Sequence, residues 1–388
     1  MCDTIAAVSA ATPAGAVLFG KNSDREYDES QYLELIPAAR HSVGSTVRLT
    51  YKEINQAPET HAVLLSKPHW IWGAEMGANA HGLVIGNEAI FAKTEASLTS
   101  GIIGMDYLRL ALERARDVDE AILVITMLLR EHGQGGNCGF KRDIAYHNSF
   151  ILADTGGAKV LETVDREWAV KPIRDYYAIS NAMTIDPFRS THEDSSKNTS
   201  GCYRRARAMD LLGDRSGSLQ LTDFFRILRD HKEGQPSPGS PSGPRICAHT
   251  RENPLGQTTA SWVASLEPGK MLHWVTGTAA PCTGLFKPLL LDTGLPYHGT
   301  RPSAGEDSTS LWWRHQHLRR YLDRSDDATR NVFSAERDAL EVRFLKAVGA
   351  SPAVAKDPDE VCHIVAICWR DGLAFENKWL ERARESPS

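Results

Sequence analysis

Short apolar runs, each bounded by turn residues, recur along the chain up to about residue 300. Runs of this kind that are rich in β-branched and aromatic residues indicate β-strands. The first two are separated by the turn signal at 12–15 (TPAG), so we expect them to form a hairpin. Strands are predicted at 4–11, 16–20, 32–36, 46–54, 61–65, 82–91, 149–153, 159–164, 168–172, 177–181, 258–266 and 271–277.

Helical spacing of apolar residues interrupts this strand pattern in two places. Helices are predicted at 105–116, 119–132, 201–212 and 221–230, and a Pro/Gly/Ser-rich loop at 231–244. Acidic residues open the helix at 119–132 and Gly133 follows its end, as helix termini prefer. Strands, two helices and strands again suit an α+β fold in which two antiparallel sheets stack between helical layers.

The pattern changes after about residue 300, where amphipathic helices replace strands. They are predicted at 308–324, 332–348 and 361–379. We therefore divide the chain into a main domain at 2–300 and a helical C-terminal extension at 301–388. The extension is interpreted as structural, packed against the sandwich or against a second subunit, which leaves a homodimer open.

The composition is that of an ordinary globular protein, with 41% hydrophobic and 24% charged residues and a net charge of −5. No long basic run favours nucleic acid or a membrane surface, and no apolar run is long enough to predict a transmembrane helix. The N-terminus shows no signal-peptide pattern, so we expect a cytoplasmic protein.

The 7 cysteines are scattered and form no CxxC pair. This spacing predicts a reducing compartment, free thiols, no zinc site and no other metal or organic cofactor. His249 stands close to Cys247 in the sequence, and we interpret it as a structural or pocket-lining residue rather than a metal ligand.

Cys2 directly follows the initiator Met1, which is readily trimmed before a small residue. A terminal cysteine combines a nucleophilic thiol with an α-amine that can accept its proton. The unperturbed pKa values are about 7.7–8.0 for the amine and about 8.5 for the thiol. Cys2 is therefore predicted to be both nucleophile and base, with no propeptide to remove. The alternative is an inert cysteine at a frayed terminus.

A polar cluster at 21–25 (KNSDR) follows the second strand and returns to the level of Cys2. Asp24 is predicted to hold the terminal ammonium in place. Arg25 or Lys21 is predicted to lower the pKa of the thiol and to contact an anionic substrate. The alternative interpretation of this segment is a solvated turn.

Several spaced motifs resemble one family. They are CDT at 2–4, FGKNSDR at 19–25, WIWGAEMGAN at 70–79, HGLVIGNEA at 81–89, EHGQGGNC at 131–138, SNA at 180–182 and GQTTAS at 256–261. Together they resemble the secernins and dipeptidases of peptidase family C69, a branch of the N-terminal nucleophile hydrolases. The resemblance spans residue 2 to about 290 and implies a four-layer αββα sandwich. More distant relatives usually carry Arg where this chain has Lys21, which leaves its role open.

The resemblance also implies roles for two asparagines at strand ends. Asn87 and Asn181 are predicted to donate hydrogen bonds to the oxyanion that forms during amide cleavage, although strand-end asparagines are commonly turn formers. An arginine near the site supports the cysteine in relatives, and Arg204 and Arg205 are the candidates here. Their alternative is a surface position on an exposed helix face.

A small peptide pocket needs aromatic walls with a few polar groups. Trp72, Glu75, Asn79 and His81 are predicted to supply them, although a packed loop anchored by tryptophans explains the same pattern. The function predicted is that of a cysteine amidohydrolase or dipeptidase acting on small peptide or N-acyl amide bonds through a thioester. The alternatives are a non-catalytic secernin-like binding protein and an acyltransferase or amidase on a specialised metabolite.

Overall fold

Two antiparallel sheets form the centre of the computed structural model, which describes residues 2–13, 15–231, 245–249, 256–350 and 358–385. The six-stranded sheet has the order β14 (Tyr176–Ile179), β1 (Cys2–Ala7), β2 (Val17–Arg25), β15 (Gln257–Glu267), β16 (Lys270–Val275) and β17 (Lys287–Leu289). The seven-stranded sheet has the order β13 (Glu167–Pro172), β12 (Gly157–Val164), β11 (His147–Asp154), β10 (Val84–Ile90), β9 (Met76–Asn79), β8 (Val63–Pro68) and β3 (Gln31–Ile36).

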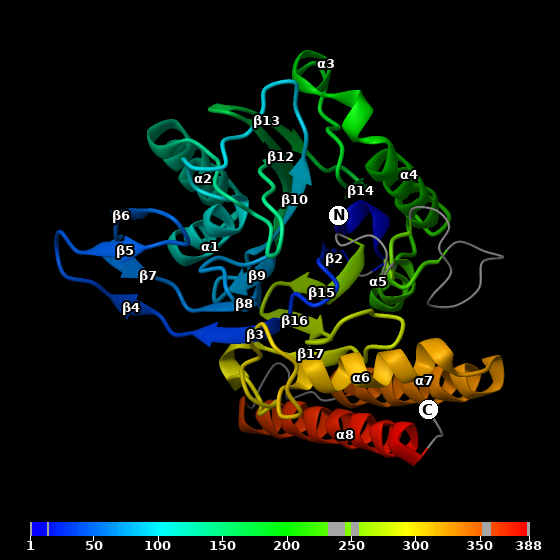
Figure 1. The fold of residues 1–388 in the computed structure, drawn as a ribbon. Helices are drawn as coiled ribbons and strands as arrows, with labels where there is room; N and C mark the ends of the chain where they lie inside the picture. The colour runs from blue at the N-terminus through cyan, green and yellow to red at the C-terminus, as the bar shows by residue number, and fades with distance from the viewer. Residues whose placement is uncertain (1, 14, 232–244, 250–255, 351–357, 386–388) are drawn as a thin grey trace.

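Helices cover the outer face of each sheet (Figure 1). On the seven-stranded sheet, α1 (Gly104–Arg114) packs against β9 and β10, and α2 (Val118–His132) against β11 and β12. On the six-stranded sheet, α4 (Thr199–Gly213) packs against β14 and β1, and α5 (Leu221–Leu228) against β2 and β15. The short α3 (Phe188–His192) precedes α4. The predicted αββα sandwich is confirmed.

Strand alternation explains why the sheets are buried on both faces. On β1, Ile5 faces the helices and packs in a cluster with Phe224, while Ala6 faces the second sheet in a cluster with Ile151. The same alternation separates Leu18 from Phe19 on β2. A strand buried on both sides reads as a continuous apolar run, as these segments do.

The polar segment at 21–25 belongs to β2 and is buried along its whole length, so it is a strand and not a solvated turn. The predicted strand at 46–54 is instead the small hairpin of β5 (Thr46–Arg48) and β6 (Glu53–Asn55). Asp106 accepts hydrogen bonds from the backbone and side chain of Thr50, which ties the chain between these strands to α1. A second small sheet pairs β4 (Ala39–Arg40) with β7 (Glu59–Thr60).

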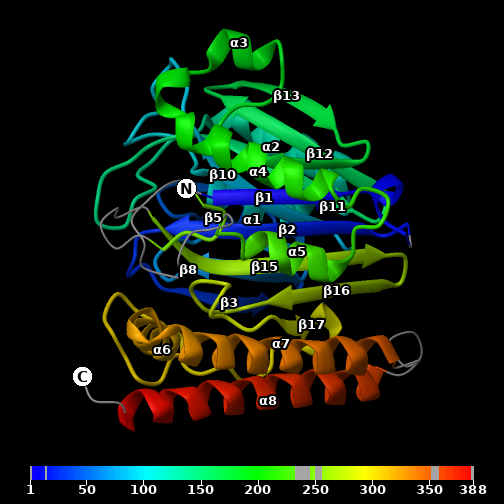
Figure 2. The same cartoon turned by 90° about the vertical axis from the view of Figure 1, so that its right-hand side faces the viewer.

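Three helices complete the chain: α6 (Leu311–Arg324), α7 (Asp327–Ala350) and α8 (Pro358–Glu385). All three predicted C-terminal helices are thus confirmed, the second and third at greater length. They lie beside the β17 edge of the six-stranded sheet (Figures 1 and 2), and Trp369 of α8 donates a hydrogen bond to the Pro288 carbonyl of β17, 2.8 Å away. The division at residue 300 into domains stays a prediction.

Within the described part of the chain, no helix is long and apolar enough to cross a membrane. Of the predicted loop at 231–244, only His231 belongs to the described residues.

Candidate active site

Cys2 is the first residue of β1 and pairs opposite Ser23 of β2. Its side chain is buried, with 6% of the residue exposed. The sulfur accepts a hydrogen bond from the Asp24 backbone N–H at 3.3 Å and lies 3.9 Å from Glu75 Oε2. The hairpin thus brings the polar end of β2 back to the thiol, as its sequence predicts.

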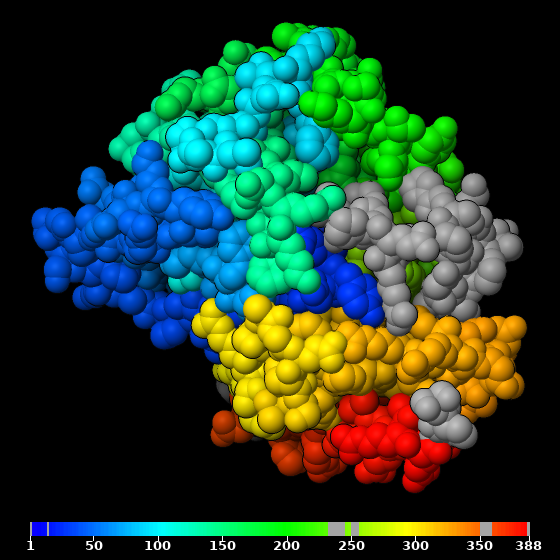
Figure 3. Space-filling view, in the orientation of Figure 1, coloured from blue at the N-terminus to red at the C-terminus, as the bar shows by residue number. Residues whose placement is uncertain are grey.

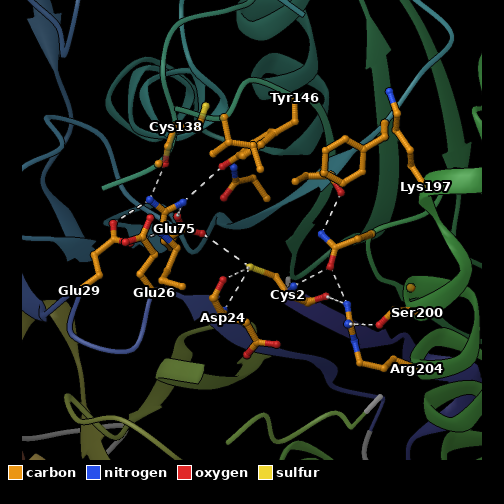
Figure 4. A pocket seen from close by; sticks show the side chains of 18 residues that line it. Cys2, Asp24, Glu26, Glu29, Glu75, Cys138, Tyr146, Lys197, Ser200 and Arg204 are labelled. Carbon is orange, nitrogen blue, oxygen red and sulfur yellow. Dashed lines mark hydrogen bonds and ion pairs between the residues drawn. The ribbon is translucent and has the colours of Figure 1, made fainter. Parts of the chain in front are cut away.

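A cavity of about 130 Å³ opens at this thiol. In Figure 4, Asp24 and Glu75 lie on one side of Cys2, and Arg204 and Ser200 on the other. The cavity is lined by residues of both sheets, of α4 and of the loops between them. The lining residues are Cys2, Asp24, Arg25, Glu26, Glu29, Glu75, Asn87, Ala89, Phe91, Cys138, Gly139, Ile144, Tyr146, Asn181, Lys197, Ser200, Gly201 and Arg204.

Burial controls the charge state of the thiol. Removal from water raises the pKa of Cys2 to about 12, and the positive charge of Lys21 opposes this shift. Nearby Glu88 and Glu75 add to the increase in pKa. At neutral pH the buried thiol therefore keeps its proton until a base beside it removes the proton.

Lys21 is fully buried and does not line the cavity. Its Nζ donates to the Asn87 carbonyl at 2.5 Å and lies 3.4 Å from Glu88 Oε1. Burial alone would lower the pKa of Lys21, but Cys2, Glu88 and Glu75 raise it, so the ammonium stays charged. The expected contact with substrate is corrected, because the cation acts on the thiol from behind the cavity.

Asp24 lies beside Cys2 on β2 and lines the cavity. Its Oδ1 accepts a hydrogen bond of 2.6 Å from the Thr258 hydroxyl. Burial raises the pKa of Asp24 to about 7. Its carboxyl is therefore in the position from which it can hold an ammonium at residue 2, and that role stays a prediction.

Asn87 extends from β10 into the cavity on the side of the seven-stranded sheet. Its Nδ2 has Met105 Sδ as a partner at 3.4 Å, and sulfur is a weak acceptor. An amide N–H with so weak a partner can turn to a developing oxyanion at small cost. This geometry fits the predicted donor role of Asn87.

Asn181, by contrast, is engaged on both sides of its amide. Its Oδ1 accepts from the Cys2 backbone N–H at 2.9 Å and from Arg204 Nη2 at 2.5 Å. Its Nδ2 donates to the Ala89 carbonyl at 2.9 Å. The carbonyl oxygen of Asn181 therefore holds the nitrogen of Cys2, which is a positioning contact that the donor prediction did not include.

Arg204, and not Arg205, reaches the site. Arg204 is fully buried, pairs with Asp3 at 3.0 Å and donates to the Cys2 carbonyl at 3.2 Å and to Ser180 Oγ at 2.7 Å. Arg205 instead donates to the Ala178 carbonyl and stacks over Tyr177, 4.9 Å from the ring centre. The alternative open in the sequence is thereby decided, and the expected pocket position of Arg205 is corrected.

Arg25 closes the opposite side of the cavity. Its guanidinium donates to both Glu29 oxygens, at 2.7 and 3.1 Å, and to the Cys138 carbonyl at 2.6 Å. Nη1 lies 3.4 Å from Glu75 Oε1 and 3.4 Å from the Tyr146 hydroxyl. The guanidinium thus fixes the carboxylate of Glu75 next to the thiol, as a buried ion pair would.

Three predicted pocket residues lie elsewhere. Asn79 lies on β9, and its Nδ2 donates to the carbonyls of Leu112 and Ala115, so it closes the end of α1. Trp72 packs beneath the guanidinium of Arg109, 3.9 Å from the ring centre.

His81 is exposed and contacts His61 at 3.1 Å. None of these three residues lines the cavity, and their expected placement is corrected. Trp72 and Asn79 of the tryptophan-rich motif instead contact α1.

Sequence reasoning missed several residues of the site. Asp3 follows Cys2 directly, but its partner Arg204 stands about two hundred residues away, so no spacing connects them. Glu29 carried a local signal, because it stands four residues after Arg25. Tyr146 and Phe91 come from loops and strand ends without a motif that marks them.

A buried thiol at the start of a central strand, in an αββα sandwich, defines the cysteine type of N-terminal nucleophile hydrolase. Residues 11–239 match the family described as acyl-coenzyme A:6-aminopenicillanic acid acyl-transferase, which is more than half of the chain. The chain belongs to this family and is an enzyme acting on C–N bonds of amides.

Solved structures of similar fold have little sequence in common with this chain. A variant of the conjugated bile acid hydrolase from Clostridium perfringens is 16% identical, with a TM-score of 0.51, over 76% of this chain and 94% of that protein. The penicillin V acylase from Agrobacterium tumefaciens is 14% identical, with a TM-score of 0.45, over 74% and 86%. The likeness to the bile acid hydrolase confirms the sandwich fold.

Proposed function

We propose that this enzyme hydrolyses the amide bond of small peptides or N-acyl compounds through Cys2, after removal of Met1. The observation that carries the proposal is the position of both reactive groups of one residue. The sulfur of Cys2 faces a cavity between Asp24 and Glu75, and its nitrogen is held by Asn181.

The reaction begins when the α-amine of Cys2 takes the thiol proton, directly or through a water. The thiolate attacks the substrate carbonyl carbon, and Nδ2 of Asn87 donates to the oxyanion. The protonated amine then gives its proton to the leaving nitrogen, the C–N bond breaks, and a thioester remains on Cys2. Water attacks the thioester while the amine takes a proton from this water. The C–S bond then breaks, the carboxylic acid leaves, and the ammonium returns its proton to the sulfur of Cys2.

The charged residues act on this sequence of steps from outside the reacting atoms. Lys21 favours the thiolate against the effect of burial on the pKa of Cys2. Arg204 and Asn181 fix the nitrogen and the carbonyl of the same residue, so that both reactive groups keep one orientation. Holding the reactive groups in one orientation raises the reaction rate, because less entropy is lost on reaching the transition state.

Small peptides of the secernin-type dipeptidase class are the proposed substrates. A free peptide ammonium requires a carboxylate near the scissile bond, and Glu75 lies 3.9 Å from the sulfur of Cys2. Linear N-acyl compounds, which lack the ammonium, are the second class.

Acyl transfer is a second candidate function, because the matching family is described as an acyl-transferase. The same thioester would then be attacked by an amine in place of water. A non-catalytic binding role has less support, since a binding surface does not require a thiol, an amide donor and a buried cation at one point.

The test is a single-turnover reaction with a panel of dipeptides and N-acyl amino acids, quenched in acid and analysed by peptide mass mapping. We expect an acyl group on the peptide that contains Cys2, and its absence in Cys2→Ser. Cys202→Ser, which removes an exposed thiol, is the matched control. Free acid as the product supports hydrolysis, whereas an amide formed from an added amine supports transfer. No acyl-enzyme and no turnover across the panel would contradict both.

A further inference from the structure

Four side chains with metal-binding atoms converge at a second place in the fold, apart from the cavity at Cys2. They are His231, Cys247, His249 and Cys282, and one nitrogen or sulfur from each lies within 4.8 Å of all the others. Cys247 and His249 are buried, and the other two are partly exposed. The first follows α5, the last follows β16, and the middle pair lies in the segment 245–249.

Hydrogen bonding alone does not satisfy this cluster. Nε2 of His249 lies 2.9 Å from His231 Nε2, 3.2 Å from Cys247 Sγ and 3.2 Å from Cys282 Sγ. An imidazole nitrogen has either one proton or one lone pair, so it makes one of these three contacts as a hydrogen bond. Two nitrogens and two sulfurs gathered around one point are instead the donor set of a metal ion.

We propose that His231, Cys247, His249 and Cys282 bind one zinc ion in a tetrahedral site. Zinc takes histidine nitrogen at about 2.0–2.1 Å and thiolate sulfur at about 2.3 Å, so neighbouring ligand atoms stand about 3.3–3.8 Å apart. The contacts of 2.9 and 3.2 Å are slightly shorter than these separations. A tetrahedral set of two sulfurs and two nitrogens selects zinc over magnesium or calcium, which require oxygen ligands.

Charge balance supports the assignment. Two thiolates neutralise the divalent ion, and two neutral imidazoles add no charge, so the complete site can be buried without a net charge. Arg319, whose Nη1 lies 3.5 Å from His249 Nδ1, is itself paired with Asp323 at 3.2 Å. A cavity of about 230 Å³ lined by His231 and Cys282 gives an ion access to the cluster.

The site is structural rather than catalytic, because four protein ligands leave no open position for a substrate. The zinc ligands are linked to Asp24 by hydrogen bonds at the start of β15. His249 bridges to Gln257, and the backbone N–H of Ala248 donates to Thr258 Oγ1, whose hydroxyl in turn donates to Asp24. Zinc would therefore stabilise the wall of the catalytic cavity through Thr258.

This inference reverses the sequence-based prediction that the chain has no zinc site and that His249 is not a ligand. The spacing signal failed for a physical reason. The ligands are a close pair, Cys247 and His249, and two residues that only the fold of the sheet brings to them, so no CxxC or HxxxH pattern appears.

The test uses the full chain, stripped of metal by a chelator and titrated with zinc and with cobalt. We expect one equivalent of zinc by elemental analysis, and with cobalt a thiolate charge-transfer band together with the visible absorption of a tetrahedral ion. Cys282→Ser and His231→Gln, both at partly exposed positions, should lose stoichiometric binding. Cys202→Ser and Cys2→Ala should retain it, because neither residue belongs to the cluster.

Thermal unfolding distinguishes a lost ligand from a lost fold. Zinc should raise the Tm of the wild-type protein and leave the Tm of a folded His231→Gln variant unchanged. Substoichiometric zinc that Cys282→Ser binds equally well would overturn the proposal. A disulfide between Cys247 and Cys282, seen as the mass loss of two hydrogens in protein that binds no zinc after reduction, would also overturn it.

Discussion

Two cysteine sites in this molecule differ in what surrounds the sulfur. At Cys2 the thiol faces a cavity among carboxyls, amides and buried cations. At Cys247 and Cys282 two thiols face two imidazoles, with all four ligand atoms close together. A lone thiol with a base and an oxyanion donor is arranged for attack on carbon, whereas paired thiols with imidazoles are arranged for an ion.

A change at one of the two sites should leave the other site intact, so each site can be tested separately. The largest expected effect is at the nucleophile. Cys2→Ala should lower kcat/KM by about 10³-fold or more, since it removes the attacking sulfur atom. Steady-state kinetics on a substrate turned over by the wild-type protein measures this.

The matched control is the metal content of the same variant. Cys2→Ala should bind zinc as the wild-type protein does. Loss of zinc in this variant, or full activity without the thiol, would contradict the separate roles assigned to the two sites.

The next effect is on stability and comes from the buried pair of Arg204 and Asp3, each with 1% of the residue exposed. Arg204→Ala leaves a buried carboxylate without its partner and should lower the free energy of unfolding by about 3–5 kcal/mol. Urea denaturation provides the measurement. Arg205→Ala, one residue away, loses one hydrogen bond at a half-buried position and should cost only about 1 kcal/mol. Equal losses in the two variants would contradict this assignment.

Two asparagines give the third prediction, in which rate and stability separate. Asn87→Ala should lower kcat by about 10²–10³-fold with a small change in KM, because it removes the donor to the oxyanion. Asn79→Ala should leave kcat unchanged and lower the free energy of unfolding by about 1–3 kcal/mol, because the carbonyls of Leu112 and Ala115 at the end of α1 lose their donor. A kcat loss in Asn79→Ala as large as in Asn87→Ala would refute the placement of the donor.

The last prediction is a pH dependence of stability. Burial raises the pKa of Asp24 from 3.8 to about 7. Between these values the folded chain keeps a proton that the unfolded chain has released, so this residue's contribution to stability falls as pH rises from about 4 to 7.

Replacement of the carboxyl should remove this slope. The urea midpoints at pH 5 and pH 7 should therefore differ less in Asp24→Asn than in the wild-type protein. All other carboxyl groups are the same in the two proteins, so the comparison isolates the contribution of Asp24. An unchanged or steeper slope in the variant would show that Asp24 is ionised in the folded protein.

Much of this fold can be predicted from the sequence because its strands are apolar on both faces. Leu18 and Phe19 read as one buried run, and the structure shows them facing different layers of the same sandwich. The hairpin at 46–54 could not be predicted from the sequence. The interruption between its two strands depends on Asp106, which belongs to a helix far along the chain.

The site was predicted where its residues are neighbours in sequence or belong to a motif. Cys2, Asp24, Asn87 and Asn181 line the same cavity, as their motifs suggest. Asp3, Tyr146 and the four residues of the second cysteine site were not predicted, because their partners meet only after the sheets have paired. For the same reason, Asn79 was misplaced by the motif that contains it.

The central claim is that Cys2 is the terminal nucleophile of a working active site. Intact mass of the purified protein before and after treatment with a thiol-directed electrophile tests it most directly, alongside Cys2→Ala. The account predicts a chain that lacks Met1 and gains one adduct rapidly, with no such adduct in the variant. A chain that retains Met1, or one labelled equally fast without Cys2, would contradict it.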